Sequence, residues 1–316
     1  MISAAQPALA IETSLRSAHW LSGEAALQRA GRECIEHLLR NETAGRAGDP
    51  EGIHQMRVAV RRLRAILSGF APLLPAEPRR RAADQLRWLA GTLGEARNLD
   101  VLALDIIAPA CAVLPPSTGW ERLAEVIERH RHYAHAEVEA AINSDRYAAS
   151  VRQVTHWFDE KGWHSHQDIG PLGRPVGELA PMLLERRYRL VKKRSKDFTG
   201  QSEAQRHQLR IVLKKMRYTG ELLADLYDQA ASQRFIQCIK RLQDDLGYRN
   251  DVSVARETMK ELTRPKSRDL DLVKAGRRVL AWHKQRLAGN EGDARRHLRK
   301  LFETPPFWSY INLRPA

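Results

Sequence analysis

The sequence feature that most constrains the fold is a basic amphipathic segment between Asp49 and Phe70. At about 100° per residue, one face of this segment is apolar and consists of Met56, Val60, Leu63, Leu67 and Phe70. The opposite face is cationic and consists of His54, Arg57, Arg61 and Arg64. The spacing therefore predicts a helix that packs one face into a core and presents the other to water or to an anion.

The same pattern returns 153 residues later, between Gln205 and Leu223. Its cationic face is His207, Arg210, Lys214 and Arg217, opposite Leu209, Leu213, Met216 and Leu223. Arg62 and Lys215 stand next to the two cationic faces and are counted with them as candidate ligands. A single basic helix face is usually a solvated surface. Because a histidine is followed by cations at the same three offsets in both copies, the repeat favours a bound anion instead.

Both segments resemble the signature helices of the CHAD family, a histidine-containing α-helical domain. The resemblance extends to LRWLAGTLGEARNLDVL at 86–102 and RLQDDLGYRNDVSVA at 241–255, which are similar to the family's LG-x-x-R-D-x-D-V and Q-x-x-LG-x-x-N-D elements. Tyr218 and Glu221 fit its RY-x-x-E continuation. Two residues depart from the pattern: Asn98 replaces an aspartate, and Arg249 precedes Asn250. The resemblance covers about residues 20–303.

The resemblance implies a function, because members of this family bind inorganic polyphosphate. It implies non-catalytic binding in a cationic groove or pore, without a cofactor or metal, and association with polyphosphate granules in a bacterial cytoplasm. Other phosphate polyanions are further possible ligands.

The charge balance independently favours a polyanionic partner. The chain has 52 Lys and Arg against 38 Asp and Glu, a formal net charge of +14, which suits polyphosphate, nucleic acid or an anionic membrane. Aromatic residues make up only 6% of the chain and none interrupts a cationic face, so the stacking platforms of single-strand binders are lacking. This favours polyphosphate and leaves binding to an RNA or DNA backbone as the main alternative.

A phosphate-processing enzyme is the less favoured alternative. The sequence has no HExxH, GxxxxGK[ST], GxGxxG or GxSxG motif. His54 and His207 have cations rather than carboxylates at helical neighbour spacing. We therefore expect binding without catalysis.

The remaining periodicities predict an all-α fold, because no alternating Val- or Ile-rich run indicates a sheet. We expect two helical bundles related by a pseudo-twofold axis: a first repeat at 15–160, a joint at 161–177 and a second repeat at 178–303, between tails at 1–14 and 304–316. Predicted helices span 15–40, 50–70, 78–93, 99–111, 118–142 and 145–158, then 177–198, 203–223, 235–246, 252–262, 269–288 and 292–302.

The helix predicted at 177–198 supplies two further candidates. Arg186 and Lys193 fall on the same side as Leu179, Met182, Leu183 and Leu190. Cations on an apolar side either extend along it to water or line a wet cavity that a polyanion could enter.

Other reactive residue types give weaker indications. Cys34, Cys111 and Cys238 are far apart and are expected in the core rather than in disulfides. A metal could bind at His164 and His166, or among His130, His132 and His135, but exposed histidines are the better expectation.

The N-terminus does not resemble a signal peptide, and no apolar run reaches the ~20 residues of a membrane-spanning helix. We therefore expect a soluble, cytoplasmic protein.

Overall fold

The computed structural model describes residues 21–164, 170–264 and 269–309, and these residues form helices and no strand. The predicted all-α fold is confirmed, while the predicted N-terminal tail and His166 lie outside the described residues. The α-helices are α1 (Gly23–Arg40), α2 (Glu42–Arg46), α3 (Pro50–Gly69), α4 (Ala76–Thr92), α5 (Gly94–Asp100), α6 (Ala108–Val113), α7 (Thr118–Ile142), α8 (Asp145–Asp159), α9 (Val176–Arg194), α10 (Glu203–Leu223), α11 (Gln229–Thr263), α12 (Leu270–Gly289) and α13 (Glu291–Glu303). A π-helical segment, η3 (Val101–Ile107), joins α5 to α6, and short 3-10 turns are η2 (Ala71–Leu73), η4 (Gly170–Gly173), η5 (Phe198–Gly200) and η6 (Ala224–Leu226).

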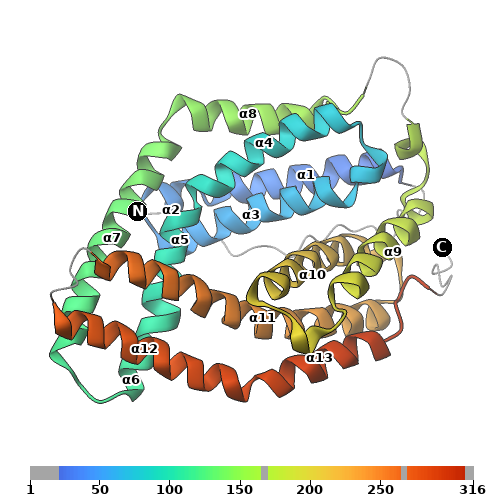
Figure 1. The fold of residues 1–316 in the computed structure, drawn as a ribbon. Helices are drawn as coiled ribbons and strands as arrows, with labels where there is room; N and C mark the ends of the chain where they lie inside the picture. Colours follow the sequence, from blue (N-terminus) through green and yellow to red (C-terminus); the bar gives the residue numbers. More distant parts are fainter. Residues whose placement is uncertain (1–20, 165–169, 265–268, 310–316) are drawn as a thin grey trace.

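The helices form two groups that meet through α3 and α10 (Figure 1). In the N-terminal group α1 packs on α3, α3 on α4, and α4 on α8. In the C-terminal group α9 packs on α10, α10 on α11, and α11 on α13, so the order of packing partners is the same. At the other end of the molecule α7 packs against α12 (Figure 1). The twofold relation between the groups and the limits of the repeats remain predictions.

The two repeated helices bury the apolar faces that the sequence predicts. On α3 the stripe from Met56 to Phe70 is at most 2% exposed, and on α10 Leu209, Leu213, Met216 and Leu223 are fully buried. These side chains belong to one continuous hydrophobic cluster that includes both groups of helices. Because their apolar faces are fixed in this core, α3 and α10 cannot rotate about their axes, and their cationic faces have defined directions.

Both repeated helices begin at a capping side chain. The Asp49 side chain accepts a hydrogen bond from the Glu51 amide at 2.9 Å, and Pro50 occupies the first helical position of α3. At the start of α10, Ser202 and Gln205 form a capping box, each side chain accepting from the other's backbone amide.

The turns predicted after the third helix of each repeat are helical instead. The chain from Gly94 to Val113 continues through α5, η3 and α6, and α11 runs unbroken where two helices were predicted. A helical glycine costs about 1 kcal/mol relative to alanine, so packing outweighs the turn preference here. A Cβ at Gly94 would lie 3.3 Å from Arg57 Nη1, and one at Gly247 would lie 3.9 Å from Arg210 Nε. These glycines face the arginines of the two repeated helices.

A short helix, α2, occupies a segment that was expected to be irregular. It packs so closely on α3 that a Cβ at Gly52 would lie 2.7 Å from both the Ala44 Cβ and the Gly45 amide nitrogen. Gly48 then has a φ of +74°, which turns the chain into α3.

The start of the predicted C-terminal tail is part of the core. Phe307 and Trp308 are 5% and 6% exposed, and both rings pack edge-on against Phe235. The helical repeat therefore does not mark the end of the packed structure. No helix among the described residues is long and apolar enough to cross a membrane.

Candidate functional site

The two predicted cationic faces meet at one cavity of about 220 Å³ where α3 and α10 pack together. We call it the cationic pocket. Five of its lining residues are Lys or Arg, and one is a carboxylate, Asp251 of α11. The polar lining residues are His54, Arg57 and Arg61 from α3, Arg97 and Asn98 from α5, Arg210 and Lys214 from α10, and Asn250 and Asp251 from α11.

Arg57 and Arg61 are held in place by neighbouring groups. Arg57 Nη1 donates to the Gly94 carbonyl at 2.8 Å and more weakly to the Leu93 carbonyl at 3.4 Å, where α4 meets α5. Arg61 Nε donates to the Tyr218 hydroxyl at 2.6 Å. The same hydroxyl accepts from Arg217 Nη2 at 2.9 Å, so Tyr218 connects a cation of α3 to one of α10.

The α10 cations have fewer partners. Arg210 Nη2 lies 3.5 Å from Asp251 Oδ1, and its Nε is buried without a hydrogen-bond partner among the described residues. Lys214 has no ion pair or hydrogen bond within the described part of the chain. Buried cations without sufficient counter-charge are unfavourable, and a bound anion relieves that cost.

The pKa values of two pocket side chains are lowered, by burial and by this excess of positive charge. Burial, reinforced by Arg210, Arg61 and Arg57, lowers the pKa of Lys214 to about 7, although Asp251 acts in the opposite direction. Burial and Arg97 lower the pKa of the His54 imidazole. Both groups therefore lose charge in the free protein that a phosphate anion would restore.

The second histidine of the repeat occupies a different environment. His207 is exposed, does not line the cationic pocket, and places Nδ1 2.7 Å from the Asn250 side-chain oxygen. It therefore contacts a lining residue without lining the pocket itself. The two copies of the motif are not equivalent at their histidines.

The later cations of both stripes leave the pocket, because two crossing helices face one another over a limited length. Arg64 is exposed, and Arg217 lies 3.5 Å from Glu221 in an ion pair. Lys215 is half-buried, and Arg187 and Arg64 help burial to lower its pKa.

The helix α9 candidates do not point inward. Arg186 and Lys193 are exposed, and Met182 is 43% exposed. The buried side of α9 is therefore rotated about the helix axis from the side that was predicted. The inward cation is Arg187, 7% exposed, which donates to Ser68 Oγ at 2.7 Å. Its pKa is lowered to about 10 by burial and by Arg186. The prediction missed Arg187 because Leu183, Leu184 and Val191 define the stripe that is actually buried.

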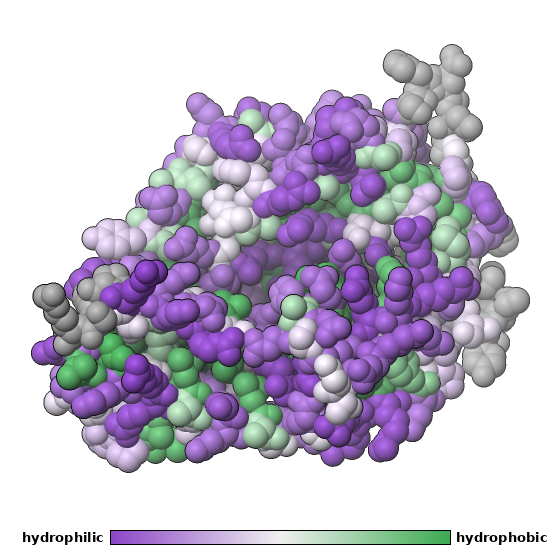
Figure 2. Space-filling model, viewed as in Figure 1, coloured by the Kyte–Doolittle hydropathy of each residue, from purple (hydrophilic) through white to green (hydrophobic). Residues whose placement is uncertain are grey.

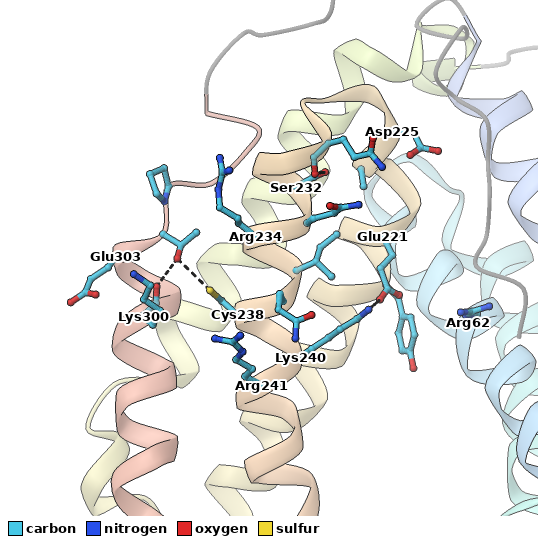
Figure 3. A pocket seen from close by; sticks show the side chains of 18 of the residues that line it. Arg62, Glu221, Asp225, Ser232, Arg234, Cys238, Lys240, Arg241, Lys300 and Glu303 are labelled. Atoms are coloured by element: carbon cyan, nitrogen blue, oxygen red, sulfur yellow. Dashed lines mark hydrogen bonds and ion pairs between the residues drawn. The ribbon is translucent and has the colours of Figure 1, made fainter.

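A second, larger cavity is a groove of about 1020 Å³ between α10, α11 and the end of α13 (Figure 3). Arg62 approaches it from α3, and Lys240 pairs with Glu221 at 3.5 Å. Its charged lining residues are five cations, Arg62, Arg234, Lys240, Arg241 and Lys300, and three carboxylates, Glu221, Asp225 and Glu303. The smaller cationic pocket has far less compensation for its charge, so it is the stronger candidate for an anion.

The molecular surface is hollowed and polar near the middle of the molecule (Figure 2). In the view of Figure 1 the molecule is hollowed between its upper and lower helices, and mostly hydrophilic side chains surround the hollow (Figure 2).

Two of the remaining histidine candidates have structural partners, while His130 and His132 are exposed. His164 bonds to Glu24, and His135 Nε2 lies 3.0 Å from Asp100. Within the described residues no group of three His, Cys, Asp or Glu side chains is placed to hold a metal ion. The three cysteines are free, with Cys34 in the core and Cys111 and Cys238 half-buried.

Arg97, Asn250 and Asp251 were not predicted as site residues. They lie in the segments that resemble the LG-x-x-R and LG-x-x-N-D elements, which was the available signal. These residues approach α3 and α10 because of the way the helices pack, which cannot be deduced from periodicity along the sequence.

Comparison with known proteins identifies related chains. A family model described as the CHAD domain matches residues 29–260. Two uncharacterized proteins of Mycobacterium tuberculosis are 29% identical over 246 residues, which is 73% of this chain and 44% of each relative, so the match spans less than half of their length.

Solved structures have the same fold. The crystal structure of the CHAD domain from the plant Ricinus communis aligns with a TM-score of 0.75 and 24% identity, over 89% of this chain and 92% of that one. PptA from Streptomyces chartreusis aligns with a TM-score of 0.66 and 17% identity, over 89% and 99% of the two chains.

Proposed function

Because the chain belongs to the CHAD domain family, we propose that it binds inorganic polyphosphate without catalysis and that the cationic pocket holds part of the phosphate chain. The observation that carries this proposal is the convergence of five cations and one carboxylate on a single cavity. Arginine offers a planar fork and lysine a compact ammonium to phosphate oxygens, so a ligand with about one charge per phosphate would compensate both.

The composition of the pocket supports phosphate over a nucleobase as the group recognised. None of its lining residues is Trp, Tyr or Phe. Base stacking, which supplies roughly 1–3 kcal/mol per base in single-strand binders, therefore has no platform there. In the same proposal the protein associates with polyphosphate granules in the cytoplasm.

The proposal predicts that both halves of the chain contribute to one site. Replacing Arg57 and Arg61 with Gln should weaken polyphosphate binding about as much as replacing Arg210 and Lys214 with Gln. A loss of at least about tenfold is expected for each pair, since charge-assisted hydrogen bonds contribute about 1.5–3 kcal/mol apiece. Affinity is measured at physiological salt, and circular dichroism checks that each variant is folded.

The double variant Arg186→Gln with Lys193→Gln is the matched control. It removes the same two charges from exposed positions of α9, so it should change affinity by no more than about twofold. If the control weakens binding as much as the pocket variants, general charge rather than the pocket binds the ligand.

A further inference from the structure

Lys214 has the environment of a reactive amine. Its neighbours are Arg57 and Arg61 from α3, Arg210 from its own helix, and Asp251 from α11. It lines an open cavity and has no ion pair or hydrogen bond among the described residues. Lysines become nucleophilic when they are desolvated beside other cations, because the neutral amine is then populated near neutral pH.

The same neighbours could hold the leaving group of an acyl donor. Three guanidinium groups next to Lys214 provide donors for a phosphoryl group, and a cavity of about 220 Å³ admits a small molecule. An acyl phosphate that binds with its phosphoryl group on these arginines brings its acyl group into the cavity that Lys214 lines. Such positioning accelerates a bimolecular reaction.

We propose that Lys214 is an acylation site for small acyl phosphates and that this modification weakens polyanion binding in the cationic pocket. The Nζ lone pair attacks the acyl carbon, an N–C bond forms, and the C–O bond to phosphate breaks. Orthophosphate leaves with the electron pair of that bond, and the proton released from the amine passes to the phosphate or to water. The product is a neutral amide that takes up no proton when a polyanion binds, so the pocket loses one of its five cationic side chains.

The amine's protonation supports this assignment. In the free protein the Lys214 side chain has a pKa of about 7 and is largely neutral at pH 8, whereas an ordinary lysine with a pKa of roughly 10.4 is almost entirely charged there. A bound phosphoryl group raises the pKa of Lys214, and the attack proceeds through the neutral fraction of the amine, which is larger than for an ordinary lysine. The effect on polyphosphate rests on the proposed function, but the acylation itself does not.

Lys215 provides an internal control within the same chain. It is adjacent in sequence and its pKa is also lowered by burial, yet it does not line the cationic pocket. A reaction governed by desolvation alone would modify both lysines. A reaction that depends on phosphoryl binding in the pocket would modify Lys214.

The full chain is incubated with acetyl phosphate at pH 8, and acetylation at each lysine is followed by mass spectrometry. Lys214 should react at least about tenfold faster than Lys215, and added orthophosphate should slow Lys214 alone. Arg210→Gln should slow acetylation of Lys214 without affecting Lys215. Equal rates at the two lysines, no protection by orthophosphate, or an unchanged rate in Arg210→Gln would each overturn the assignment.

Polyphosphate binding is then compared between unmodified and acetylated protein. Acetylation of Lys214 should weaken binding about tenfold, consistent with the loss of one charge-assisted hydrogen bond. Unchanged affinity would overturn the regulatory part of the inference. If the unmodified protein fails to bind polyphosphate, the proposed function fails, while the acetylation rates and orthophosphate protection still decide whether Lys214 is an acylation site.

Discussion

At the scale of single residues, the cationic pocket differs from an ordinary basic surface because two of its side chains carry less charge than their type suggests. Lys214 has a pKa of about 7, and the pKa of His54 is below its usual value. Both are bases, so a lowered pKa means that the free protein binds fewer protons than the unfolded chain. A polyanion reverses this shift, and binding should take up protons.

The lowered pKa values of Lys214 and His54 predict that the affinity for polyphosphate depends on pH. Polyphosphate binding should strengthen about tenfold or more as pH falls from 8 to 6, since one pKa unit corresponds to about a tenfold change in equilibrium constant. Lys214→Arg, which stays charged, should flatten the part of the profile between about pH 8 and 7. Calorimetry in buffers of different ionisation enthalpy measures the protons taken up.

The control for this prediction is His207→Gln, because His207 lies outside the pocket. Its pH profile should run parallel to that of the unaltered protein, whereas His54→Gln should flatten the lower part. A profile that Lys214→Arg and His54→Gln leave unchanged would contradict the account of these two side chains.

Away from the pocket, the fold is stabilised by a titratable pair, His135 and Asp100. Asp100 is fully buried and accepts from Arg131 and from His135, while the other ring nitrogen of His135 lies 2.9 Å from the Gly48 carbonyl. Both ring nitrogens thus face acceptors, as suits a charged imidazole. The hydrogen bond with Asp100 is the main reason that the pKa of His135 is raised.

Replacing His135 should therefore destabilise the protein in a pH-dependent way. His135→Gln should lower the unfolding free energy by about 1–3 kcal/mol at pH 5, below the unfolded pKa of histidine. Because the folded pKa is raised, this loss should shrink as pH rises through that value. Denaturation with urea from pH 5 to 9 tests this, with exposed His132→Gln as control; a loss that is constant with pH would show that packing alone is responsible.

At the scale of helices, the sequence predicted most of the elements because their signals are local. Asp49 with Pro50, Ser202 with Gln205, and the apolar stripes of α3 and α10 identify these helices without tertiary information. The helix breaks predicted near Gly94 and Gly247 were wrong. The chain is helical at both positions, and each glycine faces an arginine of a repeated helix. On α9, Arg186 and Arg187 differ by one residue, and only packing determines which is buried.

The close packing of α2 on α3 makes a prediction of its own. Gly52→Ala should destabilise the protein by about 1–3 kcal/mol, because the new Cβ would lie 2.7 Å from Ala44 Cβ and the Gly45 amide nitrogen. Gly91→Ala in α4 is the matched control, since a Cβ there meets nothing within 4 Å. Thermal unfolding compares the two. An equally stable Gly52→Ala protein would mean that α2 can move away from α3 without loss.

At the scale of the whole molecule, the charged faces of two distant segments become one site because α3 and α10 pack together between the two groups of helices. The sequence predicted the cationic residues His54, Arg57, Arg61, Arg210 and Lys214 that line the pocket. It did not predict that Arg64, His207, Arg186 and Lys193 lie outside it, because the crossing of the helices selects which turns face each other. The M. tuberculosis relatives are more than twice as long as the matched region, so the proposal of polyanion binding concerns this chain and not the relatives as whole proteins.

The central claim is that this site selects a phosphate chain rather than a nucleic acid. Its most direct test is the affinity of the full chain for polyphosphate, tRNA and duplex DNA, measured side by side at physiological salt. Polyphosphate should bind at least about tenfold more tightly than either nucleic acid, because the pocket supplies charge without stacking surfaces. Equal affinities for the three polyanions would contradict the claim and favour a nucleic-acid-binding protein.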